Sequence, residues 1–240
     1  MESQKFSELG EREREQYNKG LERGGYEKIF NHCRYFYIRR RYSLIKEMMQ
    51  CAQGKKVLEI GSTAWRGWLD NNSILPSSLT CINISEAELQ AGVDSAASSD
   101  NSPDFILMDA HDLQFEDGTF DFVYGDAILH HLNMVPALDE IFRVLKPNGK
   151  ILFVEPLDVN PAGKLVRYLT KKARTSDEQP LRLCDITEIK KRFETQFFYE
   201  ELLSVPCGVL SGMLFKNPSN SLMRFAFRAD QFLDRNFSWL

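Results

Sequence analysis

The sequence predicts an α/β fold with a parallel sheet and a helical arm ahead of it. Short β-like runs alternate with helical patterns through the middle of the chain, several of these runs end in a polar residue or a glycine, and the first 51 residues read as helical. Strands that alternate with helices form βαβ units, which build parallel sheets with right-handed crossovers. The 240 residues, 43% hydrophobic and 27% charged, fit one globular domain with a small accessory segment.

Five strands are expected from the apolar runs. They lie at residues 56–60, 79–84, 104–108, 121–125 and 150–154. Before the fifth run, apolar side chains recur at helical spacing at Val135, Leu138, Ile141, Phe142 and Leu145. The Lys-Pro-Asn-Gly sequence that follows predicts the end of this helix and a turn. Late strands are expected within residues 193–205, and a final amphipathic helix at 222–233.

The segments on either side of the predicted core are expected to act as covers. Residues 1–51 read as a helical arm or lid, densely charged at 11–22. Residues 52–240 read as the main domain, in which the segment at 158–182, rich in Lys, Arg and Thr, resembles a lid-like insertion. Because the charged arm is separate from the core, its helices are also expected to mediate a homo-oligomer.

Composition argues against several classes of partner. The 30 Lys and Arg against 34 Asp and Glu give a net charge of -4, which disfavours binding to nucleic-acid phosphates. The charged N-terminus is unlike a secretory signal, and no apolar run approaches the roughly 18 residues of a membrane span. No membrane partner and a cytoplasmic location are therefore expected. Five cysteines without a Cys-x-x-Cys pair are expected to be free thiols, and the four histidines lack the spaced acids of a metal site.

The expected strands end in residue types that can bind a ligand. In an open parallel sheet, ligands bind beyond the carboxyl ends of the strands. The first run ends in Glu-Ile-Gly-Ser at residues 59–62, an acid followed by a tight glycine turn. The second run ends at Asn83, the third at Asp109, and the fourth leads into His130-His131. The fifth is preceded by Arg-Val-Leu-Lys-Pro-Asn-Gly, which ends at residue 149.

Together these motifs resemble the core of the class I S-adenosyl-L-methionine (SAM)-dependent methyltransferases. The resemblance runs from about residue 55 to residue 156 and is to the ubiquinone/menaquinone-type small-molecule group. It implies a Rossmann-like, seven-stranded and mostly parallel sheet flanked by helices. It also implies SAM as the cofactor and methyl transfer as the activity.

The resemblance assigns cofactor contacts to the strand ends. The implied residues are Glu59, Gly61 and Ser62 for the methionine end, Asn83 and Ile84 for the ribose and adenine, Asp109 and Ala110 for the adenine, and Gly125 beneath the sulfonium. Core packing is the alternative for Ile84 and Ala110. Asp109 is the stronger candidate, because an acid at the end of an apolar strand needs a polar partner.

Two departures from the family pattern concern the strength of cofactor binding. Thr63 and Trp65 stand where the family's first loop usually has glycines, which lack a Cβ and let backbone approach the cofactor. Asn83 stands where the family usually has an acid, and an amide binds ribose hydroxyls without charge assistance. Weaker SAM binding, or a degenerate fold without cofactor, is the alternative that these changes leave open.

Catalysis is expected to involve a histidine after the fourth strand. Histidine suits proton transfer near neutral pH. The run Asp-Ala-Ile-Leu-His that ends at His130 also resembles the phosphoethanolamine methyltransferases, in which this histidine pairs with an N-terminal tyrosine. That resemblance implies His130 as the base, with Tyr17 or Tyr26 as its partner. His131 is a second candidate, and packing or helix capping is the alternative for either histidine.

The predicted function is transfer of a methyl group from SAM to a small-molecule acceptor, in secondary-metabolite biosynthesis. O-, N- and C-methylation are not separated, and C-methylation of an apolar or prenylated acceptor fits the aromatic flanks. One alternative is a methyltransferase of protein or RNA. Against it stand the net charge of -4 and the lack of an Asn-Pro-Pro-aromatic motif. The other alternative is a non-catalytic partner protein with the methyltransferase fold.

Overall fold

A computed structural model describes residues 6–19, 27–61, 74–97, 103–158, 164, 167–168, 175, 177–198 and 202–236. The chain divides into two compact units. The sheet unit comprises residues 1–21, 46–157 and 175–193, and the helical unit comprises 22–45, 158–174 and 194–240. Residues of the predicted arm, 1–51, thus belong to both units. The predicted domain boundary after residue 51 stays a prediction.

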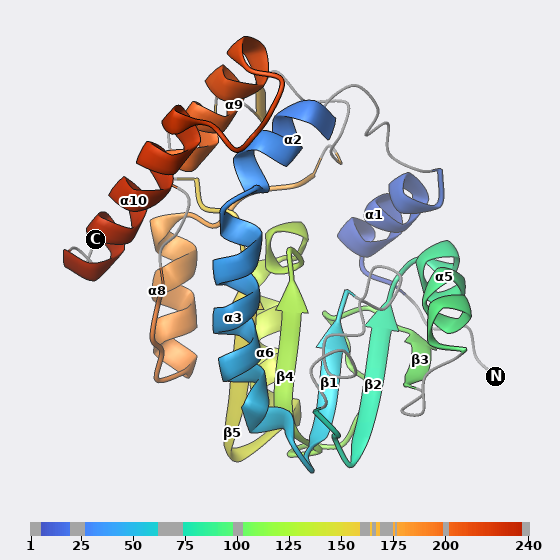
Figure 1. Cartoon of the computed structure of the whole chain (residues 1–240). Coiled ribbons are helices and arrows are strands. Elements are labelled where there is room, and N and C mark those ends of the chain that lie inside the picture. Colours follow the sequence, from blue (N-terminus) through green and yellow to red (C-terminus); the bar gives the residue numbers. More distant parts are fainter. Residues whose placement is uncertain are drawn as a thin grey trace. The chain divides into compact units, whose positions relative to one another are not determined.

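The sheet unit is built on five parallel strands (Figure 1). They are β1 (Lys56–Ile60), β2 (Ser78–Asn83), β3 (Asp104–Leu107), β4 (Phe120–Asp126) and β5 (Leu145–Val154). Their order in the sheet is β3-β2-β1-β4-β5, and every neighbouring pair is parallel. The chain order therefore reverses direction at β1, which creates a topological switch point beside β4. The predicted parallel α/β fold is confirmed.

The predicted number of strands is not confirmed. The described residues form one five-stranded sheet, whereas seven strands were expected. The late strands expected at 193–205 are absent from the described part of that segment, where residues 194–198 have no regular structure and Ser204 begins a helix. The aromatic residues of this segment produce an apolar run, but a strand also needs a neighbour with which to pair its backbone groups.

Burial explains why the central strands read as continuous apolar runs. Val57, Leu58 and Ile60 of β1 are 0%, 0% and 1% exposed, so both faces of the strand are covered. Helix α6 (Met134–Val144) contributes Leu138 and Ile141 to this core. Two members of its predicted apolar stripe, Val135 and Phe142, are instead exposed, and the Phe142 ring packs edge-on against Phe193.

Several shorter elements complete the sheet unit. They are α1 (Glu8–Lys19), η1 (Gln50–Ala52), α5 (Glu86–Ala96), η2 (Leu129–His131) and α8 (Leu183–Arg192). Helix α5 begins after Ser85, whose hydroxyl accepts a hydrogen bond from the backbone N–H of Glu88 and so caps the helix. Figure 1 shows α1 beyond the arrowheads of β1 and β2, at the carboxyl end of the sheet.

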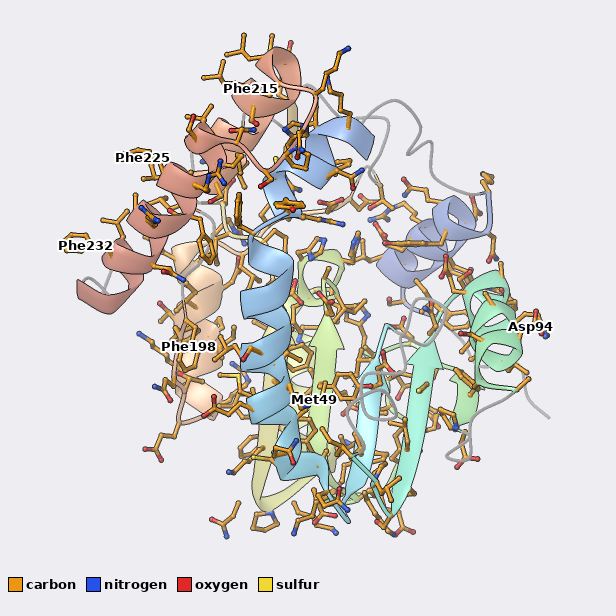
Figure 2. All side chains as sticks on the ribbon, viewed as in Figure 1. Met49, Asp94, Phe198, Phe215, Phe225 and Phe232 are labelled. Carbon is orange, nitrogen blue, oxygen red and sulfur yellow. The ribbon has the colours of Figure 1, made fainter. Side chains whose placement is uncertain are left out.

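The helical unit contains α2 (Glu27–Arg34), α9 (Ser204–Leu214) and α10 (Ser221–Asn236), and α3 (Tyr37–Met49) contributes residues to both units. The amphipathic helix predicted at 222–233 lies within α10 and is confirmed. Figure 2 labels Phe225 and Phe232 on α10 and Phe215 directly after α9, and all three side chains are exposed. None of the helices in the described residues has the length and hydropathy needed to cross a bilayer.

Candidate active site

A pocket lies at the carboxyl ends of β1 to β4, beneath α1. Its open space is about 590 Å³, a volume that includes the solvent space at its mouth. Strand ends supply most of its lining: Ile60, Gly61, Ile82, Asn83, Ile84, Met108, Asp109, Ala110, His111, Ala127, Ile128, His131 and Leu132. Helix α1 supplies Gly10, Glu13 and Tyr17. The switch point of a parallel sheet is where such a site is expected.

Five of the predicted cofactor residues meet in this pocket. They are Gly61, Asn83, Ile84, Asp109 and Ala110. Glu59 and Gly125 belong to the neighbouring strands but are not part of the lining. Ser62, together with Thr63 and Trp65, lies outside the described residues, so the path of the first loop stays a question for experiment.

Glu59 is held inside the sheet. Its side chain is 4% exposed, and its carboxylate accepts hydrogen bonds from the hydroxyl of Tyr124 at 2.8 Å and from the thiol of Cys81 at 3.3 Å. These partners lie on the two strands that flank β1. In this arrangement Glu59 ties β1 to its neighbours at the base of the pocket.

Ile128 packs over two glycines and forms part of the pocket wall. A Cβ at Gly61 would lie 2.5 Å from Cγ1 of Ile128, and a Cβ at Gly125 would lie 2.5 Å from its Cγ2. Gly61 also has a φ of +69°, a conformation that residues with a Cβ rarely adopt. The two glycines thus make room for Ile128 where the chain leaves β1 and β4.

Asp109 anchors the first turn of α1. Its Oδ2 accepts hydrogen bonds from the backbone N–H and the hydroxyl of Ser7, at 2.9 and 2.7 Å, while the Ser7 Oγ accepts one from the N–H of Gly10. Its Oδ1 accepts hydrogen bonds from the N–H and the Nδ1 of His111. Burial alone would raise the pKa of Asp109, but the hydrogen bonds from His111 and Ser7 outweigh it and hold that pKa well below its usual range. Asp109 is therefore an ionised carboxylate at neutral pH.

The last turns of α1 are attached to the start of α5. Arg14 forms an ion pair with Glu86, which also accepts a hydrogen bond from the amide of Asn18. The Ser85 hydroxyl donates to the Asn18 amide oxygen at 2.6 Å. The hydrogen bond from Arg14 lowers the pKa of Glu86 to about 2. Contacts at both ends thus hold α1 across the pocket.

Tyr17 pairs with His131 and not with His130. The Tyr17 hydroxyl lies 3.2 Å from Nε2 of His131, and the two rings meet edge-on with centroids 5.7 Å apart. On the other side of the ring, Nδ1 lies 3.0 Å from Oε2 of Glu13 and 3.3 Å from Oγ1 of Thr175. The structure therefore builds a tyrosine–histidine pair, but with the neighbour of the predicted histidine. Tyr26 lies outside the described residues.

His130 faces the loop that follows β5. Its Nδ1 lies 2.7 Å from Oε2 of Glu155, whose Oε1 accepts hydrogen bonds from the N–H groups of Ile128 and Leu129. Its Nε2 lies 3.7 Å from Oε1 of Glu178, and it is not among the residues that line the pocket. The contact with Glu155 orients η2, so that the next residue, His131, faces the pocket.

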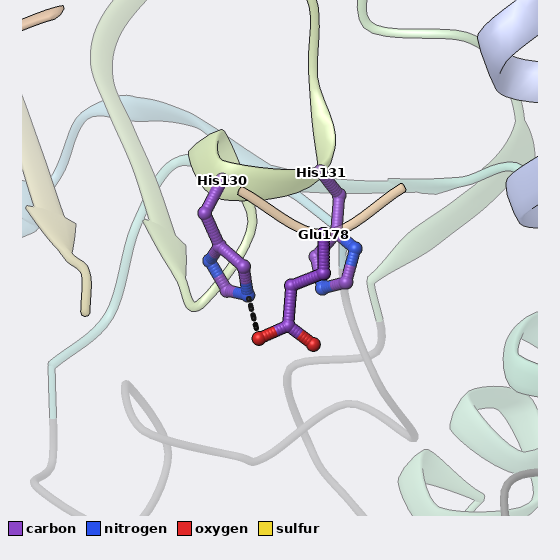
Figure 3. Close-up of side chains that lie close together, drawn as sticks. All are labelled: His130, His131 and Glu178. Carbon is purple, nitrogen blue, oxygen red and sulfur yellow. Dashed lines mark ion pairs between the residues drawn. The ribbon is translucent and has the colours of Figure 1, made fainter. Parts of the chain in front are cut away.

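Three metal-ligating side chains come together beside the pocket (Figure 3). One ligand atom each of His130, His131 and Glu178 lies within 4.8 Å of the others, and Figure 3 marks the His130–Glu178 ion pair. The sequence did not indicate this cluster, because Glu178 is distant from the two histidines in the chain. Both ring nitrogens of His131 already lie within 3.3 Å of a polar atom of Tyr17, Thr175 or Glu13. A metal ion would have to displace one of these contacts.

The residues of α1 are the part of the site that sequence reasoning missed. Gly10, Glu13 and Tyr17 are spaced by three and four positions, so they share one face of the helix. Tyr17 was predicted as a catalytic candidate, whereas Gly10 and Glu13 were not predicted as site residues. The spacing was the available signal, although the charged composition of α1 conceals it.

Comparison with known proteins agrees with this geometry. A family model described as "Methyltransferase domain" matches residues 58–153, which span β1 to β5. The sheet of this chain, from β1 to β5, is therefore similar to a methyltransferase domain. This match agrees with the predicted methyltransferase core and with SAM as its cofactor.

Curated methyltransferases match this chain over less than half of its length. A glycine/sarcosine/dimethylglycine N-methyltransferase of Actinopolyspora halophila is 33% identical over 89 residues, 36% of this chain and 16% of that protein. A demethylmenaquinone methyltransferase of Staphylococcus aureus is 33% identical over 110 residues, 45% of this chain and 45% of that protein. The match to each relative thus spans less than half of that protein as well.

Solved structures show the same fold at low sequence identity. A SAM-dependent methyltransferase from Methanosarcina mazei has a TM-score of 0.52 and 22% identity, covering 64% of this chain and 86% of that one. The [4+2]-cyclase SpnF has a TM-score of 0.53 and 17% identity, covering 83% of this chain and 76% of that one. The fold alone therefore does not determine the reaction.

Proposed function

We propose that the methyltransferase transfers the methyl group of SAM to a small-molecule acceptor, with Tyr17 and His131 removing a proton from that acceptor. The observation that carries the proposal is the meeting of these two side chains in the pocket that the predicted cofactor residues line. Bound SAM supplies a methyl group already activated by its sulfonium. The protein then has to orient the acceptor, exclude water and accept a proton.

The lining of the pocket suits SAM. Asn83 offers an amide for the ribose hydroxyls, and the apolar side chains of Ile84, Met108 and Leu132 suit an adenine ring. Gly61 brings backbone without a Cβ to the pocket wall. These residues would hold the cofactor between the strand ends and α1.

The tyrosine–histidine pair has a carboxylate, Glu13, beside the ring nitrogen that faces away from Tyr17. With a proton on Nδ1, the Nε2 of His131 carries the lone pair that faces the Tyr17 hydroxyl. Glu13, 3.0 Å from Nδ1, stabilises the imidazolium that proton transfer would create. A base placed in this way contributes about 10²–10⁴-fold to the rate. His130 acts in this proposal through Glu155, as a positioning residue.

The acceptor in this proposal is a small molecule with an O–H or N–H group, since such groups need a base. The names of the relatives, which specify glycine, sarcosine and demethylmenaquinone, support acceptors of this size. The cover that α1 places on the pocket also favours a small molecule over a protein or RNA. Secondary metabolism, a cytoplasmic location and a homo-oligomer remain part of the proposal and rest on composition and sequence pattern.

The test separates cofactor binding from turnover. Calorimetry with SAM should show binding by the wild type, and SAM with a labelled methyl group should label small molecules in a filtered metabolite extract. Tyr17→Phe and His131→Asn should bind SAM within about threefold of wild type, but should transfer methyl groups about 10²-fold more slowly or worse. His130→Asn should slow transfer less, because His130 does not line the pocket. Full turnover by His131→Asn, or no SAM binding by the wild type, would refute the proposal.

A further inference from the structure

Glu13 is a buried carboxylate whose oxygens accept no hydrogen bond among the described residues. Its side chain is 1% exposed and lines the pocket. Its Oε2 lies 3.0 Å from Nδ1 of His131, but without hydrogen-bond geometry. Buried carboxylates are normally hydrogen-bonded or paired with a cation, because removal from water costs a charged group several kcal/mol.

The basic residues of α1 do not compensate this charge. Arg12 forms an ion pair with Asp177, Arg14 with Glu86, and Lys19 with Glu15. In the part of the chain that the structure describes, no lysine or arginine forms an ion pair with Glu13. The face of α1 that meets the pocket thus presents one acidic side chain and no basic one.

The packing of α1 holds this carboxylate in the pocket. Gly10, one turn earlier on the same face, lets the helix approach Asp109 so closely that an added Cβ would lie 2.5 Å from Oδ2. Tyr17, one turn later, contacts His131. Between these two contacts Glu13 lies buried in the pocket wall.

We infer that Glu13 recognises a positively charged group on a ligand of this pocket. The inference rests on the proposed function, which offers two sources of the same chemistry. One is the sulfonium of SAM, and the other is the ammonium group of an amine acceptor. In both cases an onium group would occupy the space in front of Glu13 and supply the charge that the protein lacks there.

The alternative is a purely structural role, in which Glu13 pairs with protonated His131. Stability of the free protein separates the two. A structural ion pair makes the wild type more stable than Glu13→Gln, whereas a buried carboxylate that is retained for a ligand destabilises the protein when that ligand is absent. Glutamine has nearly the same shape and no charge, so Glu13→Gln should leave the melting temperature of the free protein unchanged or higher.

The binding test uses charged and neutral forms of the cofactor. Calorimetry measures SAM, which carries a sulfonium, and S-adenosylhomocysteine, which has a neutral thioether at the same position. If the ligand cation is the sulfonium, Glu13→Gln weakens SAM binding about 10-fold or more and S-adenosylhomocysteine binding less than about threefold. Glu15→Gln is the matched control, because Glu15 lies on the same helix with its side chain 70% exposed; it should leave both affinities unchanged.

A second arm tests the amine acceptor. Protein saturated with S-adenosylhomocysteine is titrated with sarcosine, dimethylglycine and ethanolamine. If the ligand cation is an ammonium group, the wild type binds one of these amines, Glu13→Gln binds it about 10-fold more weakly, and the SAM to S-adenosylhomocysteine ratio is unchanged.

Two results overturn the inference by itself. In one, neither the affinity ratio nor amine binding depends on Glu13. In the other, Glu13→Gln lowers the melting temperature of the free protein and weakens both cofactor forms equally, as a structural ion pair would. A wild type that binds neither SAM nor S-adenosylhomocysteine refutes the proposed function, and this inference with it.

Discussion

Gly10→Ala should detach the first turn of α1 from the pocket. The added Cβ would lie 2.5 Å from Oδ2 of Asp109 and 3.0 Å from Oγ of Ser7. Neither atom can yield independently, because Ser7 donates two hydrogen bonds to this same Oδ2. The helix must therefore move away from Asp109 and break the contacts that hold its N-terminus.

The opposing free energies can be compared. Within a helix, alanine is more favourable than glycine by about 1 kcal/mol. Each hydrogen bond from Ser7 to the ionised Asp109 contributes about 1.5–3 kcal/mol. Loss of both therefore exceeds the helical gain by about 2 kcal/mol or more, which lowers the docked population of α1 about 30-fold.

Hydrogen exchange measures this population directly. The protection of the α1 amides should fall about 30-fold in Gly10→Ala, and SAM binding should weaken because α1 supplies part of the pocket wall. Glu15→Ala is the control, since it adds an alanine on the exposed face of α1 and should change protection only a few-fold. Protection in Gly10→Ala equal to or above that of wild type would refute the close approach of α1 to Asp109.

Three further predictions concern the helical unit. Gly208→Ala places a Cβ 2.6 Å from the Cα of Cys33, so it should cost about 2 kcal/mol and lower the melting temperature by several degrees. In Gly212→Ala the nearest atom to the new Cβ is 3.5 Å away, so this variant should gain up to about 1 kcal/mol of helix propensity. Calorimetric scans that rank the two variants the other way would contradict this packing. Asp230→Ala removes the acceptor of three hydrogen bonds at the start of α9 and should lower the free energy of unfolding in urea by about 2–4 kcal/mol. A decrease below about 0.5 kcal/mol would show that these hydrogen bonds are dispensable. Burial lowers the pKa of His32, so protonation favours the unfolded state, and stability should fall as the pH drops below about 6.5. His32→Gln should remove that part of the pH dependence of stability, and an unchanged profile would exclude His32 as its source.

The central sheet could be predicted because its signals are local. Strands buried on both faces leave apolar runs, and a residue such as Asp109 at the end of such a run marks a ligand-binding edge. The late strands predicted at 193–205 do not form in the described residues of that segment, and an apolar run does not reveal whether a neighbouring strand is available. In the described residues this segment leads into α9 instead.

The choice between His130 and His131 could not be made from the sequence. The two side chains leave a single short turn in different directions, and the contacts of Glu155 with that turn set which one faces the pocket. Glu155 lies 25 residues from His130 in the chain. A resemblance of local motifs therefore pointed to His130, whereas Tyr17 contacts its neighbour His131.

The sequence by itself indicated the parallel α/β sheet, the similarity to methyltransferases and five residues that line the pocket, because each depends on hydrophobic periodicity or on a motif of a few residues. Only the tertiary structure decided that α1 covers the pocket, that Tyr17 meets His131, and that Glu13 is buried there. These contacts join residues more than 100 positions apart. Such pairings depend on where the folded backbone places each side chain, which no local pattern encodes.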